Sequence, residues 1–142
     1  MESGVELKSG VDERPLVLIA EDAGAQVRLM QICMERAGCR VAAARDGREA
    51  LTALEKERPA FIILDIEMPG FNGFQVLDKL RKDPATRSIP VIMLTGHAKD
   101  SVLFDEYAGP DDIFMTKPFS PVELIDTVRR VLAKSGAGAS PQ

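Results

Sequence analysis

Runs of apolar residues alternate along this chain with segments of mixed polarity. Five runs have the length and composition of strands, at about residues 15–20, 40–44, 60–65, 90–94 and 112–115. Four of them are apolar throughout, which is typical of strands that helices cover on both faces. The segments between them repeat their apolar residues every three to four positions, the spacing of an amphipathic helix. The pattern therefore predicts alternating strands and helices.

The predicted helices begin and end at residues that favour such ends. We expect helices over about residues 24–37, 46–58, 73–82 and 99–108, and a last one that starts at Ser120. Gly38 suits the left-handed position that follows a helix. Asp46 and Glu49 have the spacing of a capping box, and Pro59 stops the same helix. Ser120, followed by a proline, is a typical N-cap.

The order of these elements predicts a doubly wound α/β fold. Five strand–helix repeats with right-handed crossovers give a parallel sheet flanked by five helices. We expect the flavodoxin-like strand order 2-1-3-4-5, whose switch point lies between the first and third strands. Two helices carry clear stripes for the core, which are Phe74, Leu77 and Leu80 in the third, and Val122, Ile125, Val128 and Leu132 in the last.

Five polar residues lie where apolar runs end. They are Glu21, Asp22, Asp65, Thr95 and Lys117. Because the carboxyl ends of parallel strands share one edge of the sheet, we expect these side chains to meet in one pocket. Carboxylates about 5 Å apart repel each other by roughly 3 kcal/mol per pair at an effective dielectric near 20, so the cluster needs a counter-charge. Oxygen ligands of this kind suit Mg²⁺.

The chemistry of this group points to phosphoryl transfer onto an aspartate. Asp65 lies between the acidic pair and Lys117, and its carboxylate can accept a phosphoryl group as a mixed anhydride. A cation, an ammonium and a hydroxyl are the parts that stabilise the transferring group. Each residue alone also has a structural explanation, since acids often follow strands, Lys-Pro can form a turn, and Thr95 can cap a helix. The five together favour the functional interpretation.

Composition narrows the possible classes of protein. The 142 residues fit one domain, and 45% are hydrophobic, enough for one core. The net charge is −4, and the 18 basic residues are scattered, which argues against direct nucleic-acid binding. No run approaches the roughly 18 apolar residues of a membrane span, so we expect a cytoplasmic protein. Cys33 and Cys39 are interpreted as reduced core thiols.

Two further expectations concern the termini and the sole histidine. Residues 1–14 and 135–142 have the composition of a flexible arm and tail, which leaves 15–134 as the folded domain. His97 lies two residues beyond Thr95, and we expect it on the exposed rim of the pocket. With a single histidine, a metal site built from imidazoles is excluded.

Four segments in the correct order resemble a known family. VLIAED, IILDIEMPGFNGFQVL, VIMLTGH and FMTKPFSPVEL are similar to the receiver domain of two-component response regulators, over about residues 15–134. The resemblance implies a flavodoxin-like signalling domain. It takes a phosphoryl group from a sensor histidine kinase or a phosphotransfer protein.

The resemblance also implies a role for each residue of the pocket. Asp65 is the phosphoacceptor and Asp22 a direct Mg²⁺ ligand. Glu21 holds the metal mainly through water, and the backbone carbonyl of Glu67 supplies another ligand. Thr95 and Lys117 bind phosphoryl oxygens. The peptide between Lys117 and Pro118 is expected to be cis, and Phe114 matches the switch position on the fifth strand.

The chain departs from the family pattern at a few positions. The switch residue is Phe114 where tyrosine is usual, so its inward state has no phenolic hydroxyl. Pro110 stands where the family usually has glycine, which puts the end of the fourth helix in doubt. Glu67 and His97 occupy positions that, in this family, tune the lifetime of the acyl phosphate.

The expected function is signalling, with the donor kinase as partner. A downstream protein would read the face made by the fourth helix, fifth strand and fifth helix. The domain would be no classical enzyme, performing only Mg²⁺-dependent self-phosphorylation and autodephosphorylation. It would act as a single-domain regulator or as part of a longer one.

Two alternatives remain at this point. A phosphohydrolase of the haloacid dehalogenase type also uses an aspartyl phosphate, but its nucleophile follows the first strand with a second Asp two residues on. Here Asp65 follows the third strand and position 67 is Glu. A receiver-like binding module without phosphorylation would lack an acid, the threonine or the lysine, and none is missing.

Overall fold

Five parallel strands form a single sheet in the order β2-β1-β3-β4-β5, as predicted. The computed structural model describes residues 12–135, so most of the predicted arm and tail, residues 1–11 and 136–142, lies outside the described residues. The strands are β1 (Leu16–Ala20), β2 (Arg40–Ala44), β3 (Phe61–Asp65), β4 (Val91–Thr95) and β5 (Ile113–Thr116). β1 pairs with both β2 and β3, which places the switch point between β1 and β3.

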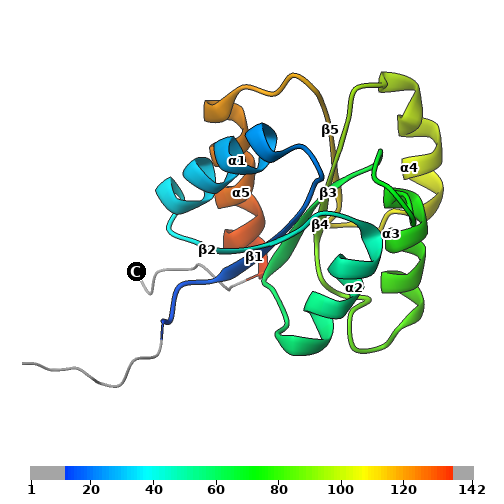
Figure 1. Cartoon of the computed structure of the whole chain (residues 1–142), viewed down its shortest axis with the longest axis horizontal. Helices are drawn as coiled ribbons and strands as arrows, with labels where there is room; N and C mark the ends of the chain where they lie inside the picture. Colours follow the sequence, from blue (N-terminus) through cyan, green and yellow to red (C-terminus); the bar gives the residue numbers. More distant parts are fainter. Residues whose placement is uncertain (1–11, 136–142) are drawn as a thin grey trace, which may run out of the picture.

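Helices cover both faces of the sheet (Figure 1). They are α1 (Gly24–Arg36), α2 (Gly47–Lys56), α3 (Gly73–Lys82), α4 (Ser101–Tyr107) and α5 (Pro121–Ser135), with a 3₁₀ turn η3 (Ala98–Asp100) before α4. α1 and α5 lie side by side on one face, and α2, α3 and α4 lie on the other. The fourth predicted helix is thus a 3₁₀ turn followed by a short α-helix.

The core has two layers because successive strand residues point to opposite faces. Phe61 and Ile63 of β3 pack with α1 and α5, whereas Ile62 and Leu64 pack with α2 and α3. All five residues of β3 are buried, which explains its continuous apolar run. Cys33 and Cys39 are free and buried, which confirms their interpretation as core thiols.

Helix ends largely follow the predicted signals. Gly38 has φ +87°, and the N–H groups of Gly38 and Cys39 donate to carbonyls of the last turn of α1. The Asp46 carboxylate accepts from the Glu49 N–H at 2.8 Å. The Glu49 carboxylate, however, accepts from the N–H of Arg45, so the expected reciprocal bond to Asp46 is shifted by one residue.

The predicted apolar stripe of α5 is wrong in its first turn. Val122 is 69% exposed, and Leu124 is fully buried in its place, with Val128, Val131 and Leu132. Val122, Leu124 and Ile125 are all apolar, so two stripes fit the same sequence, and the packing against α1 selects one. In α3, Leu77 and Leu80 are buried as predicted, whereas Phe74 is only half-buried.

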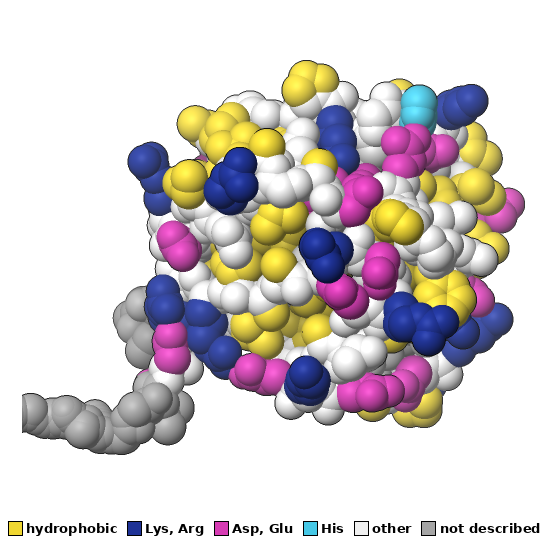
Figure 2. Space-filling view, in the orientation of Figure 1, with side chains coloured by type: hydrophobic (Ala, Val, Ile, Leu, Met, Phe, Trp, Pro, Cys, Tyr) yellow, Lys and Arg dark blue, Asp and Glu magenta, His cyan; other side chains and the backbone are white. Residues whose placement is uncertain are grey.

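Charged side chains of both signs are interspersed on the face drawn in Figure 2, without a large basic patch. Between residues 12 and 135, no helix combines the length and apolar character that crossing a bilayer requires.

The buried carboxylate of Asp112 anchors the loop that follows α4 and contains Pro110. Asp112, whose side chain is 1% exposed, pairs with the guanidinium of Arg81 on α3. It also accepts the N–H groups of Val91 at 2.8 Å and Gly109 at 2.7 Å. α4 ends at Tyr107, and this network ties the following loop to α3 and to the start of β4.

Substitution of Asp112 by alanine is expected to destabilise the fold by about 3 kcal/mol, because it leaves a charged guanidinium and two N–H groups without their acceptor. Asp111→Ala is the matched control, since Asp111 and its partner Lys134 are both exposed. The control should change the unfolding free energy by less than about 0.5 kcal/mol. Urea unfolding measures both, and equal effects would contradict the assignment.

Candidate functional site

The five polar residues predicted to converge lie together at the carboxyl ends of the strands. Glu21 follows β1, Asp65 ends β3, Thr95 ends β4, and Lys117 follows β5. Glu21, Asp65 and Thr95 are almost fully buried. Asp22 is exposed. The site therefore has a buried floor and one carboxylate at its rim, directly at the switch point of the sheet.

Three carboxylates face one another across this switch point. Glu21, Asp22 and Asp65 each offer an oxygen atom, and these atoms lie within 4.8 Å of one another. Lys117 supplies a nearby positive charge: its Nζ is 3.0 Å from Glu21 Oε1 and 3.2 Å from Asp65 Oδ1. An all-carboxylate oxygen set that retains room for water at Asp22 fits Mg²⁺ better than a softer metal.

Local backbone groups hold two of the carboxylates in place. The N–H of Ala23 donates to Glu21 Oε2 at 3.2 Å, and the N–H of Glu67 donates to Asp65 Oδ1 at 3.3 Å. Each bond therefore holds a carboxylate against the backbone of the loop that follows its own strand.

The loop after β3 depends on a glycine that the sequence analysis missed. A Cβ on Gly73 would lie 2.7 Å from the Ile66 Cα and 2.8 Å from the carbonyl oxygen of Asp65, so only glycine fits. Asn72 and Gln75 form a reciprocal capping box at this end of α3. The Asn-Gly-x-Gln sequence is a capping signal that identifies the position.

Burial and charge shift the pKa values of Asp65 and Lys117. Desolvation, together with the neighbouring Glu21 carboxylate, raises the pKa of Asp65 from 3.8 to about 6, although Lys117 opposes the shift. Desolvation lowers the pKa of Lys117, but its bonds to Glu21 and Asp65 outweigh that effect and the pKa is raised. Lys117 therefore remains a cation, and without a metal Asp65 is only weakly acidic.

The hydroxyl group of Thr95 makes two hydrogen bonds, one as donor and one as acceptor. Oγ1 donates to Asp100 Oδ2 at 2.7 Å and accepts the N–H of His97 at 3.0 Å. Asp100 was not singled out in the sequence, where it is one acid among many in a polar stretch. The backbone carbonyl of Thr95 accepts the N–H of Lys117 at 2.7 Å, so the ends of β4 and β5 are joined.

Glu67 and His97 face each other across the rim. The Nε2 atom of His97 is 2.7 Å from Glu67 Oε2, and both side chains are more than half exposed. The expected rim position of His97 is thus what the structure has. The pair links the loop after β3 to the loop after β4.

The peptide between Lys117 and Pro118 is cis. Phe114 on β5 is half-buried, and its ring packs against Phe104 of α4 with centroids 5.4 Å apart. Phe114 therefore contacts the helix that follows the Thr95 loop.

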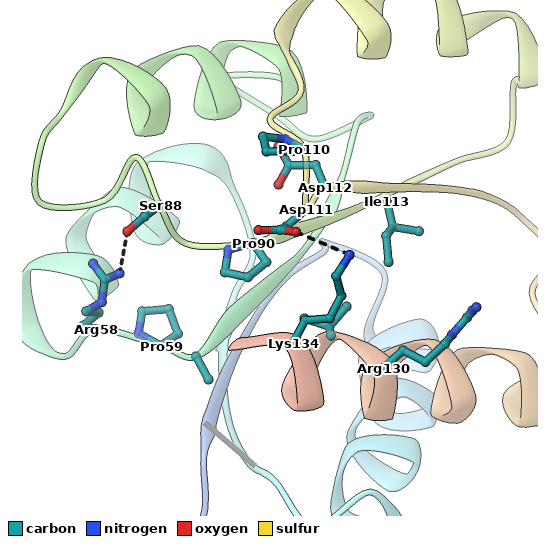
Figure 3. A pocket seen from close by; sticks show the side chains of 12 residues that line it. Arg58, Pro59, Ser88, Pro90, Pro110, Asp111, Asp112, Ile113, Arg130 and Lys134 are labelled. Atoms are coloured by element: carbon teal, nitrogen blue, oxygen red, sulfur yellow. Dashed lines mark hydrogen bonds and ion pairs between the residues drawn. The ribbon is translucent and has the colours of Figure 1, made fainter. Parts of the chain in front are cut away.

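An open pocket of about 580 Å³ lies at the opposite edge of the sheet (Figure 3). It is lined by residues before β3, β4 and β5, among them Pro59, Pro90 and Pro110, and by α5. Its charged residues are largely paired: Lys134 with Asp111, and Arg58 with Ser88. The chemistry described above is therefore separate from this pocket.

Residues 17–129 match the response regulator receiver domain family. The alkaline phosphatase synthesis transcriptional regulatory protein PhoP of Bacillus subtilis is 39% identical over 126 residues, which are 87% of this chain and 50% of that protein. The chain thus spans about half the length of this curated relative.

Solved structures of similar proteins have the same fold. The signal receiver domain of a signal transduction histidine kinase from Syntrophus aciditrophicus has a TM-score of 0.77 and 35% identity, covering 90% of this chain and 97% of that one. The phosphorylated cyanobacterial phytochrome response regulator RcpA has a TM-score of 0.71 and 25% identity, covering 91% and 99%.

In metal-free protein, Asp65→Asn is expected to be stabilising, and the gain should grow with pH. Because the folded-state pKa of Asp65 is raised to about 6, wild type holds this proton more tightly when folded. The unfolding free energy of wild type therefore falls as pH rises from about 4 to about 6, and it falls no further once Asp65 is ionised. The difference in unfolding free energy between variant and wild type should widen by about 2 kcal/mol over this pH range.

Urea unfolding in chelator at pH 4, 5, 6 and 7 measures this difference. Asp126→Asn, an exposed acid on α5, provides the control for general charge effects. A difference that stays constant across the four pH values would contradict the raised pKa.

Proposed function

The chain belongs to the response regulator receiver domain family, and from this premise we propose that Asp65 accepts a phosphoryl group from the phosphohistidine of a sensor histidine kinase or a phosphotransfer protein. The observation that carries the proposal is the placement of the Asp65 carboxylate. It lies buried at the switch point, between two further carboxylates and 3.2 Å from Lys117 Nζ.

The proposed step exchanges one bond for another. An Asp65 oxygen attacks phosphorus and forms a P–O bond, while the P–N bond to the donor imidazole breaks. The electron pair stays on that imidazole nitrogen, and the ring leaves as neutral imidazole because its other nitrogen carries a proton. The product is an acyl phosphate, which water later cleaves to return the Asp65 carboxylate and inorganic phosphate. Self-phosphorylation from acetyl phosphate would form the same P–O bond to Asp65, while the donor's P–O bond breaks and acetate leaves with the electron pair.

The residues around Asp65 are given distinct roles. Lys117 binds a phosphoryl oxygen after it gives up its present bond to Asp65, and Thr95 supplies a hydroxyl to another oxygen. Glu21, Asp22 and the carbonyl of Glu67 would hold Mg²⁺ together with Asp65. When bound, the cation offsets the negative charge that gathers on the carboxylates and the phosphoryl group.

The proposed output surface is the face made by α4, β5 and α5. Phe114 lies in β5 and packs on α4, so a movement of the Thr95 loop can change this face. We place the signalling module at residues 15–134, acting in the cytoplasm. Because the curated relative PhoP is about twice as long, the downstream protein target and any attached output activity are further parts of the proposal.

Asp65→Asn should abolish phosphorylation. The variant keeps the size of the side chain but removes the nucleophilic oxygen. After incubation with acetyl phosphate and Mg²⁺, intact-mass spectrometry should find one added phosphoryl group on wild type and none on the variant. Asp111→Asn, far from the site, should behave as wild type. A phosphoryl adduct on the Asp65 variant would make the assignment wrong.

Mg²⁺ should stabilise the fold, because it relieves the repulsion among Glu21, Asp22 and Asp65. At ten times its dissociation constant, binding to the folded state alone adds about 1.4 kcal/mol to the unfolding free energy. Thermal melts at matched ionic strength measure this gain, and Asp22→Asn should remove most of it. If saturating Mg²⁺ leaves the wild-type melt unchanged, the metal proposal fails.

A further inference from the structure

The Thr95 hydroxyl already has an acceptor inside the domain. Its hydrogen bond to Asp100 Oδ2 is 2.7 Å long, and Thr95 itself is fully buried. The other side of the oxygen accepts the N–H of His97. An ionised carboxylate only accepts hydrogen bonds, so the single hydroxyl proton of Thr95 must lie toward Asp100.

Asp100 occupies the junction between the site and the output face. It is the last residue of η3, and its backbone N–H donates to the carbonyl of His97. It also stands at the N-cap position of α4, yet among the described residues its side chain makes no capping bond to that helix. Aspartate is one of the residues that normally caps a helix. Here its carboxylate bonds Thr95 instead.

We propose that Asp100 is a positioning residue that holds the Thr95 hydroxyl and competes with the phosphoryl group on Asp65 for its one proton. The inference rests on the proposed function of Asp65. A hydroxyl can donate to one acceptor at a time, so Thr95 binds a phosphoryl oxygen only when its bond to Asp100 breaks.

Two consequences follow from this exclusion. The bond to Asp100 opposes phosphorylation, because a charge-assisted hydrogen bond is lost when the phosphoryl group binds Thr95. Breaking it also frees the Asp100 carboxylate, which lies directly before the first turn of α4. The proton of Thr95 thereby links the state of Asp65 to the start of α4.

The bond is tested first without ligand. Thr95→Val, Asp100→Ala and the double variant form a thermodynamic cycle in metal-free protein, measured by urea unfolding. We expect the two substitutions to be coupled by about tenfold in the unfolding equilibrium constant, because a hydrogen bond to a charged group is removed. Thr95→Val keeps the shape of the buried side chain, and Asp100 lies near the surface, so both variants should fold.

The competition is tested with beryllofluoride and Mg²⁺, a mimic of the phosphoryl group. Asp100→Ala should bind the mimic roughly three- to tenfold more tightly than wild type, since Thr95 is free to donate. Asp100→Asn keeps an acceptor oxygen without the charge and should lie between the two. Asp105→Ala removes a like charge from α4, the helix that follows Asp100, and should leave the affinity unchanged.

The Thr95→Val background separates competition from simple charge repulsion. If Asp100 acts through the hydroxyl, Asp100→Ala should no longer tighten binding there, whereas a charge effect would persist. Absent coupling in the ligand-free cycle overturns the proposal, and so does equal mimic affinity in wild type and Asp100→Ala. If wild type binds no mimic and gains no phosphoryl mass while the cycle still shows coupling, the proposed function of Asp65 fails and the competition with it.

Discussion

The arrangement of this site depends on the repulsion among three carboxylates at the switch point, which neighbouring groups must offset. Glu21, Asp22 and Asp65 bring oxygen atoms within 4.8 Å of one another, and two of the three are buried. Such a group is stable only beside a positive charge, which Lys117 supplies through bonds to both buried acids. The fold gathers these residues from β1, β3 and β5, so the whole sheet is needed to assemble one site.

The same arrangement explains why the site can change state. Lys117 neutralises part of the cluster but not all of it, since the pKa of Asp65 remains raised by burial and by Glu21. A divalent cation and a phosphoryl group can therefore both be accommodated by rearranging existing bonds. In the proposed reaction, Lys117 would exchange a carboxylate for a phosphoryl oxygen, and Thr95 would exchange Asp100 for another phosphoryl oxygen.

The sequence predicted the strands, their order and the five converging residues, because each depends on local pattern and on the rule that parallel strands share an edge. It did not predict which apolar residues of α5 face the core, since Val122 and Leu124 are equally apolar and only the packing with α1 distinguishes them. It also missed Asp100 and Gly73. The role of Asp100 depends on a side-chain direction, and that of Gly73 on the close approach of a backbone carbonyl.

The path from the site to the α4 face consists of short contacts that can each be broken. Thr95 bonds Asp100 at the start of α4, and Phe104 in the same helix packs on Phe114. Phe114 has no hydroxyl to hold it toward water, so burial of its ring favours the inward position whether or not Asp65 is modified. Under the proposed competition, the hydroxyl proton of Thr95 controls this path, because it has two possible acceptors, the Asp100 carboxylate and the phosphoryl group, and can bond only one of them.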